Sequence, residues 1–227
     1  MTAYLRLLVL RTVRTSWALS ALAVGVGLPL CFMLATRFQA ARPAPGGAGP
    51  EAAETLAFVG VLVLLGTGLV VTNLTAFLVH EEKQRGSSTL LRVATVDRFS
   101  PVAAYLAHGA LLAGALTATG LVAIAAGGLG FAVPAGAWPR ALVYLPSIAT
   151  VFGPLGLWLG YLLPRGMALI SAQPVAIWLA ARLSSDLTEG AAGGRVPGLL
   201  LAVVLLVHLL TLGVLPPIWR RTSGRLW

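Results

Sequence analysis

Apolar runs of about 20 residues fill most of this chain, and short basic or glycine- and proline-rich stretches separate them. An apolar helix of that length spans the hydrocarbon core of a membrane. Only 10% of the 227 residues are charged, whereas a soluble domain carries about 25%. The composition therefore excludes a water-soluble globule, and the sequence predicts an all-α polytopic membrane protein.

The apolar runs predict six membrane-spanning helices in a single domain over residues 1–227, with no internal repeat and no soluble domain. The predicted spans are, to within a few residues, 17–36, 57–80, 102–126, 140–163, 166–182 and 197–216. Residues 1–16 carry arginines at helical spacing among leucines. We therefore expect an interfacial helix there, lying on the membrane surface.

Lysine and arginine are distributed unevenly between the two sides of this predicted bundle. One side holds 11 of them and the other holds 5. Because cytoplasmic segments carry the excess of basic residues, both termini and residues 81–100 are predicted to be cytoplasmic. Topology and contact with anionic membrane lipid then account for the net charge of +9. Basic stripes interleaved with aromatics do not occur, so no nucleic-acid partner is expected.

A polar block from His80 to Gly86 interrupts the apolar sequence. Gly86 permits a sharp change of chain direction, and Ser87 can cap a short helix that follows it. The pattern predicts that the second span extends into the cytoplasm, breaks at Gly86 and continues as a short helix along the membrane surface. A solvated linker with topogenic charge is the simpler interpretation of the same residues.

This block and the residues after it resemble the signature loop of ABC-2 type transporter permeases, the membrane subunits of a class of ATP-driven exporters. The matching residues are Glu82-Lys83-Gln84-Arg85-Gly86-Ser87, Leu90-Leu91 and Val96-Asp97-Arg98. Gln84 and Ser87 depart from the family pattern, and the turn lacks the family's proline. His108 or a nearby residue stands where the family has a lysine. The segment is also similar to drug-export permeases of actinobacterial type.

The resemblance implies that residues 81–100 form a cytoplasmic coupling loop, which docks on a separate ATPase subunit that binds ATP and magnesium. It also implies a second permease subunit, identical or paralogous, and a location in the bacterial plasma membrane. Glu82 is expected either to dock or to fix the loop. The residues expected to take part in coupling are Glu81, Glu82, Arg85, Gly86, Leu90, Leu91, Asp97 and Arg98, with Arg165 in the turn of residues 164–166 as a second contact.

The activity implied is export of a lipophilic drug, a lipid or a peptide. The chain lacks the Gly-x-x-x-x-Gly-Lys-Ser/Thr pattern that cradles nucleotide phosphates. We therefore expect it to bind no cofactor and not to be an enzyme. Two alternatives remain open from the sequence. One is a haem-exporter-like permease subunit of cytochrome c maturation, and the other is a membrane scaffold without transport.

A few polar residues lie within the predicted spans: Thr72, Asn73 and Thr75 in the second, and Gln173 in the fifth. Polar groups at membrane depth face either another helix or a water-filled cavity. Hydrogen bonding between helices is one interpretation. The other is a substrate path lined by the second and fifth helices, as the resemblance implies.

The remaining chemistry-bearing residues are too few and too scattered to predict a catalytic or metal site. His108 and His208 are predicted to be hydrogen-bonded packing residues. Cys31 is the single cysteine, so it cannot form an intrachain disulfide. Gly156 and Gly160 form a small-xxx-small pattern, which lets helices approach closely, and we expect it to pack within the chain.

Overall fold

The computed structural model describes residues 2–14, 52–84, 100–126, 137–192 and 198–223, together with the isolated positions 23 and 27. Within these residues the regular elements are helices and no strand is present, which confirms the all-α class. The helices are α1 (Thr2–Arg14), α4 (Ala52–Gln84), α6 (Ser100–Ala126), α7 (Ala137–Ala149), α8 (Phe152–Leu162), α9 (Arg165–Ala192) and α10 (Gly198–Ser223).

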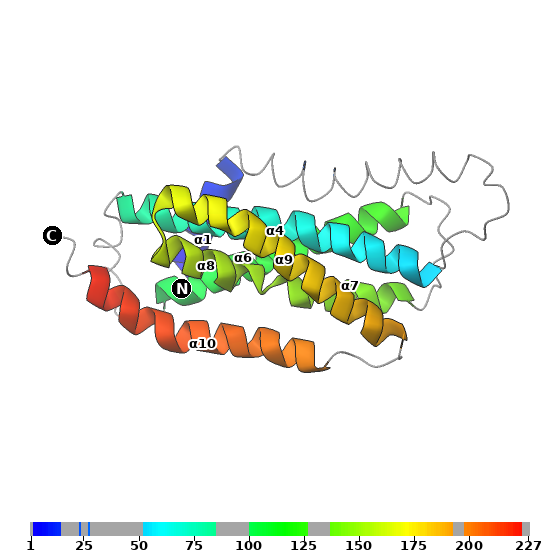
Figure 1. Cartoon of the computed structure of the whole chain (residues 1–227). Coiled ribbons are helices and arrows are strands. Elements are labelled where there is room, and N and C mark those ends of the chain that lie inside the picture. Colours follow the sequence, from blue (N-terminus) through cyan, green and yellow to red (C-terminus); the bar gives the residue numbers. More distant parts are fainter. Residues whose placement is uncertain are drawn as a thin grey trace.

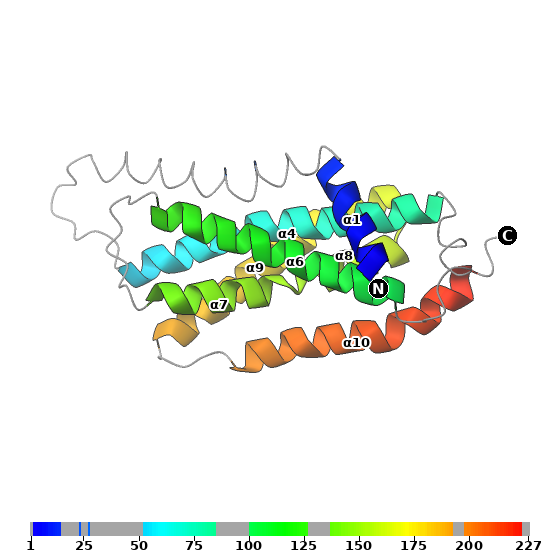
Figure 2. The same cartoon turned by 180° about the vertical axis from the view of Figure 1, so that it is seen from behind.

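The long helices lie side by side in one bundle, with α4 in contact with α6, α7, α8 and α9 (Figure 1). Helix α10 runs along the outside of the bundle. Helix α1 lies across α6 near one end, as the view from behind shows (Figure 2). The C-terminal ends of α4, α8 and α10 lie at this same end. We call it the polar end, because it holds His80, Glu82 and Lys83 of α4.

Four segments of the described chain are long and apolar enough to cross a membrane. They are Gly60–Gln84, Pro101–Val122, Leu142–Leu162 and Leu200–Ile218, and they correspond to the second, third, fourth and sixth predicted spans. The first predicted span, 17–36, lies outside the described residues apart from positions 23 and 27. The chain is therefore a membrane-embedded helical protein, and six spans remain a prediction.

The fourth predicted span is two helices, α7 and α8, which meet at Thr150 and Val151. Gly153 N donates to Thr150 O at 3.2 Å across this junction. Pro154 stands in the first turn of α8, where backbone N–H groups have no partner within the helix, so its missing donor costs little. The span predicted over 140–163 is thus present with a break that the sequence did not predict.

The fifth predicted span, 166–182, falls in α9, which is not among the four segments found in the described residues. Its composition has a packing reason. Four alanines at intervals of four residues are fully buried: Ala168, Ala172, Ala176 and Ala180. Ala176 and Ala180 belong to the same apolar cluster as Val70 and Val71 of α4. Small side chains at this spacing let α9 lie close along α4.

Glycines bring α8 equally close to its neighbours. A Cβ added at Gly156 would stand 2.5 Å from Thr72 O of α4, and one added at Gly160 would stand 2.8 Å from Ala76 Cα. On α6, a Cβ at Gly109 would stand 2.8 Å from Gly153 Cα. The pattern of Gly156 and Gly160 therefore packs within the chain, as the sequence predicted.

Replacing Gly156 by alanine should destabilise the bundle, because backbone atoms of α4 occupy the space that the new methyl group needs. We expect a loss of about 1–3 kcal/mol, the usual cost of overpacking. The matched control is Gly114→Ala in α6, where a Cβ meets nothing within 4 Å; it should be neutral or stabilising by up to about 1 kcal/mol. Thermal unfolding in detergent measures both, and equal melting temperatures for the two variants would contradict the close contact.

Candidate functional site at the polar end of the bundle

Three of the residues expected to take part in coupling lie within the described structure. Glu81 and Glu82 are in the last turn of α4, and Arg165 is the first residue of α9. The others lie outside the described residues: Arg85, Gly86, Leu90, Leu91, Asp97 and Arg98. The polar block therefore begins as helix, and residues 81–84 continue α4 as the sequence predicted.

Glu82 is buried, with 1% of its surface exposed. Its Oε2 accepts hydrogen bonds from the hydroxyls of Tyr4 in α1 and Tyr105 in α6. The two tyrosine rings meet edge to face, with centroids 5.9 Å apart. This arrangement corrects the expectation that Glu82 touches a docked subunit, because the carboxylate is enclosed by three helices. Of its two expected roles, only fixing the start of the loop fits this geometry.

The same contact holds α1 on the bundle. Tyr4, Leu8 and Thr12 recur every four residues along one face of α1, and all three are buried. Burial, and then the neighbouring Glu82 carboxylate, raise the pKa of Tyr4 above its ordinary value. The Tyr4 hydroxyl therefore keeps its proton and remains a donor to Glu82.

A second polar contact fixes α1 farther along its length. Thr12 Oγ1 lies 2.9 Å from His108 Nε2 of α6 and also donates to Leu8 O at 3.0 Å. With that hydroxyl proton engaged, the imidazole N–H is the donor to Thr12. His108 is therefore a hydrogen-bonded packing residue, as predicted, and so is His208, whose Nδ1 lies 2.8 Å from Val204 O.

Lys83, the next residue after Glu82, contacts a different part of the bundle. Its Nζ donates to Gly160 O at 3.0 Å and to Tyr161 O at 2.7 Å, and it lies 4.6 Å from the centroid of the Tyr161 ring. These carbonyls belong to the last turn of α8, where a cation is favoured because the backbone oxygens lack partners within the helix. Lys83 therefore caps α8.

The turn between α8 and α9 is held by further contacts with its surroundings. The Arg165 guanidinium lies 5.1 Å from the centroid of the Phe77 ring of α4, while the residue remains exposed. The Tyr161 hydroxyl donates to Ile218 O of α10 at 3.2 Å. Glu82, Lys83 and Arg165 thus lie at one end of the bundle, and the cytoplasmic location of that end stays a prediction.

Of the four residues expected to line a substrate path, Thr72, Asn73 and Thr75 lie within one turn of α4, and Gln173 lies on α9. Thr72 and Thr75 are fully buried against Gly156 of α8, and Asn73 Nδ2 donates to Leu69 O of its own helix at 2.8 Å. Gln173 is exposed on α9. Both threonines lie at the contact between α4 and α8. Thr72 Oγ1 donates to Phe152 O of α8 at 3.5 Å, whereas the described structure gives Thr75 Oγ1 no hydrogen bond.

Sequence reasoning missed Tyr4, Tyr105 and Lys83 as parts of this site. Tyr4 stands 78 positions from Glu82, so no local pattern connects them. The single available signal was a tyrosine among the leucines and arginines of the N-terminal segment, because a buried tyrosine hydroxyl needs a hydrogen-bond partner.

Comparison of the chain with models of known protein families, with curated proteins and with solved structures found no match.

The variant Glu82→Ala removes the acceptor that the Tyr4 and Tyr105 hydroxyls share. We expect α1 to detach more readily, by about 1–3 kcal/mol, the cost of leaving buried donors without their acceptor. Hydrogen exchange of residues 2–14 measures this opening. The same substitution at the half-buried Glu81 is the control and should leave α1 protected. Faster exchange in both variants, or in neither, would contradict the role of Glu82.

The variant Lys83→Met keeps an unbranched side chain but removes the donor to the α8 carbonyls. A hydrogen bond that involves a charged group contributes about 1.5–3 kcal/mol, so we expect faster hydrogen exchange in residues 159–168. Lys83→Arg retains the charge and several donors and should preserve most of the protection. If Arg and Met behave alike, Lys83 does not cap α8.

Proposed function

We propose that this chain is the membrane-spanning subunit of an ATP-driven exporter of ABC-2 type. It pairs with a second permease subunit and couples through residues 81–100 to a separate ATPase, which carries ATP and magnesium. Its place is the bacterial plasma membrane, with both termini in the cytoplasm. The proposal is motivated by the family-like sequence of the loop. The comparisons with known proteins add no support to it.

The observation that carries the proposal is the anchoring of the residues just before the loop. Glu82 contacts α1 and α6, while Lys83 contacts α8. A displacement of the loop by a docked ATPase would therefore act on three helices besides α4. Such anchoring supports a loop that transmits force, whereas a simple linker needs no buried contacts at its start.

ATP acts in this scheme by favouring one arrangement of the paired ATPase subunits over another, since a ligand shifts an equilibrium only by its differential affinity. The anchored end of α4 would pass that change to the bundle as a rigid-body shift. The cargo proposed is a lipophilic drug, a lipid or a peptide. No Asp, Glu, Lys or Arg stands within residues 57–80 or 166–181 to pair with a strongly charged substrate.

A haem-exporter-like permease and a membrane scaffold without transport are the other proposals that the sequence allows. The scaffold predicts no partner-dependent ATP turnover. A purified complex of this chain with an ATPase therefore separates the transporters from the scaffold, and cargo-dependent ATP turnover separates the two transporters.

The loop itself supplies a direct test. Ser88→Cys and Asp97→Cys, each with Cys31→Ser, should react with an impermeant maleimide only from the cytoplasmic side. Adding the ATPase should slow labelling at least severalfold, because docking covers the loop. A cysteine at Arg6, exposed on α1, serves as the comparison site for general accessibility. Labelling from the outer side would contradict the topology, and unchanged labelling with bound ATPase would contradict docking at this loop.

A further inference from the structure

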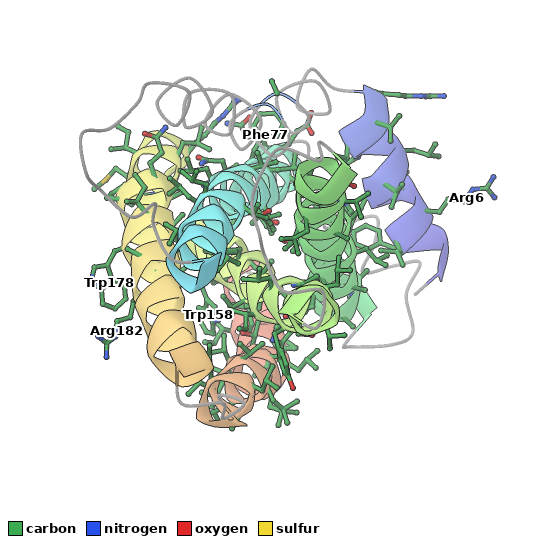
Figure 3. The ribbon with its side chains drawn as sticks, turned by 90° about the vertical axis from the view of Figure 1, so that its right-hand side faces the viewer. Arg6, Phe77, Trp158, Trp178 and Arg182 are labelled. Carbon is green, nitrogen blue, oxygen red and sulfur yellow. The ribbon has the colours of Figure 1, made fainter. Side chains whose placement is uncertain are left out.

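Helix α9 presents two unlike faces. Its alanine face lies on α4, while the opposite face exposes large apolar side chains, among them Met167, Ile170, Ile177 and Trp178. In Figure 3, Trp178 points away from the bundle and no other described helix lies beyond it. The described part of the chain therefore leaves this outer face uncovered.

The exposed residues of this face form a regular seam. Met167, Ile170, Pro174, Ile177 and Ala181 are all exposed, and their spacing alternates between three and four residues. That spacing is the one by which two helices pack along a shared seam. Gln173 precedes the seam residue Pro174, and Trp178 follows the seam residue Ile177, so they flank the seam on opposite sides.

Gln173 distinguishes this face from a surface built for lipid. Arg165 lies beside Phe77 of α4, and Ala176 belongs to the cluster that includes Val70. Gln173 is eight residues, or about 12 Å, along the helix from Arg165. It therefore lies at the depth of the middle of the Gly60–Gln84 span. An amide at that depth needs a hydrogen-bond partner, because hydrocarbon offers none.

The outer face of α10 provides the contrast. Its exposed large side chains are all aliphatic: Val203, Leu205, Leu206, Leu209, Leu210 and Val214. Lipid tails alone can cover such a surface, because aliphatic side chains need no hydrogen-bond partner. The face of α9 carries a mid-depth amide and an indole N–H, for which the structure gives no hydrogen bond within the described chain.

We propose that the outer face of α9 is the contact surface between two copies of this chain. Copies with the same topology are related by an axis along the membrane normal, so their α9 helices run parallel and matching residues meet at the same depth. Pro174 and Ile177 are consecutive seam positions. In a parallel pair, the residue just before the first of them on one helix lies opposite the residue just after the second on the other helix. Gln173 of each copy then faces Trp178 of the other.

The chemistry of this pair is complementary. The indole Nε1–H is a donor only, and the Gln173 amide oxygen is an acceptor. The two-fold axis makes the contact twice. This contact would define where the second permease subunit of the proposed function lies. The argument for the outer face of α9 depends on the chain lying in a membrane, and it does not depend on transport.

Cysteine crosslinking in native membranes tests the seam without an ATPase. With Cys31→Ser as background, Ile170→Cys and Ile177→Cys should each form a covalent dimer under mild oxidation. Leu206→Cys on the outer face of α10 should not. Monomer at both seam positions, or equal dimer at Leu206→Cys, would overturn the proposal, and lipid or a different chain would then cover α9.

A second measurement addresses the Gln173–Trp178 contact. Trp178→Phe keeps the ring and removes the donor, and Gln173→Leu removes the acceptor. Loss of two interhelical hydrogen bonds corresponds to about an eightfold lower association constant, measured by energy transfer between labelled copies in detergent. Combining the two changes should weaken association no further than either alone.

Trp158→Phe is the matched control, because its Nε1 donates to Thr211 within the same chain at 3.1 Å. It should leave association unchanged. Additive losses from Gln173→Leu and Trp178→Phe, or an equal loss from Trp158→Phe, would refute the contact. ATP turnover of the complex with an ATPase is scored separately, so failure of the transport proposal would leave this result intact.

Discussion

Close approach between helices is the constraint on which the rest of this structure depends. Lipid tails are as apolar as leucine, so burial alone gives membrane helices little reason to associate, and tight packing must supply it. The chain achieves that packing with alanines where α9 meets α4 and with glycines where α8 meets α4 and α6. These contacts fix α4 among its neighbours, and so they determine which helices its last turn can reach.

In that last turn of α4, two neighbouring residues of opposite charge, Glu82 and Lys83, contact different helices. Consecutive residues of a helix point about 100° apart and do not face each other. Glu82 therefore reaches the phenols of α1 and α6, while Lys83 reaches the carbonyls of α8. Each charge is matched by groups suited to it: hydroxyl donors for the carboxylate, and backbone acceptors at a helix C-terminus for the ammonium. Two neighbouring residues thus connect α4 to helices distant in sequence.

How far the sequence predicts this arrangement depends on the kind of signal. The all-α class, four of the spans, the packing roles of His108 and His208 and the glycine contact of α8 all follow from local pattern. The burial of Glu82 does not follow from local pattern. A charged residue at the end of an apolar helix is predicted to be solvated unless its distant partners are known. Tyr4 and Tyr105 come from two other helices, and only the tertiary structure brings them to the carboxylate.

Helix α9 shows why hydropathy alone does not predict which face of a membrane helix is buried against the protein. On α9 the buried side chains are alanines and the exposed ones include Met167, Ile170 and Trp178, so the more apolar face points outward. Where both lipid and protein are apolar, the informative residue is the polar one that faces outward at mid-depth. Gln173 was grouped with Thr72 and Thr75 by composition, yet the structure buries both threonines against α8 and leaves the glutamine on the outer surface. A polar side chain in that position needs a hydrogen-bond partner, which lipid does not offer. In the proposed dimer, the α9 helix of the second copy would supply one at the same depth.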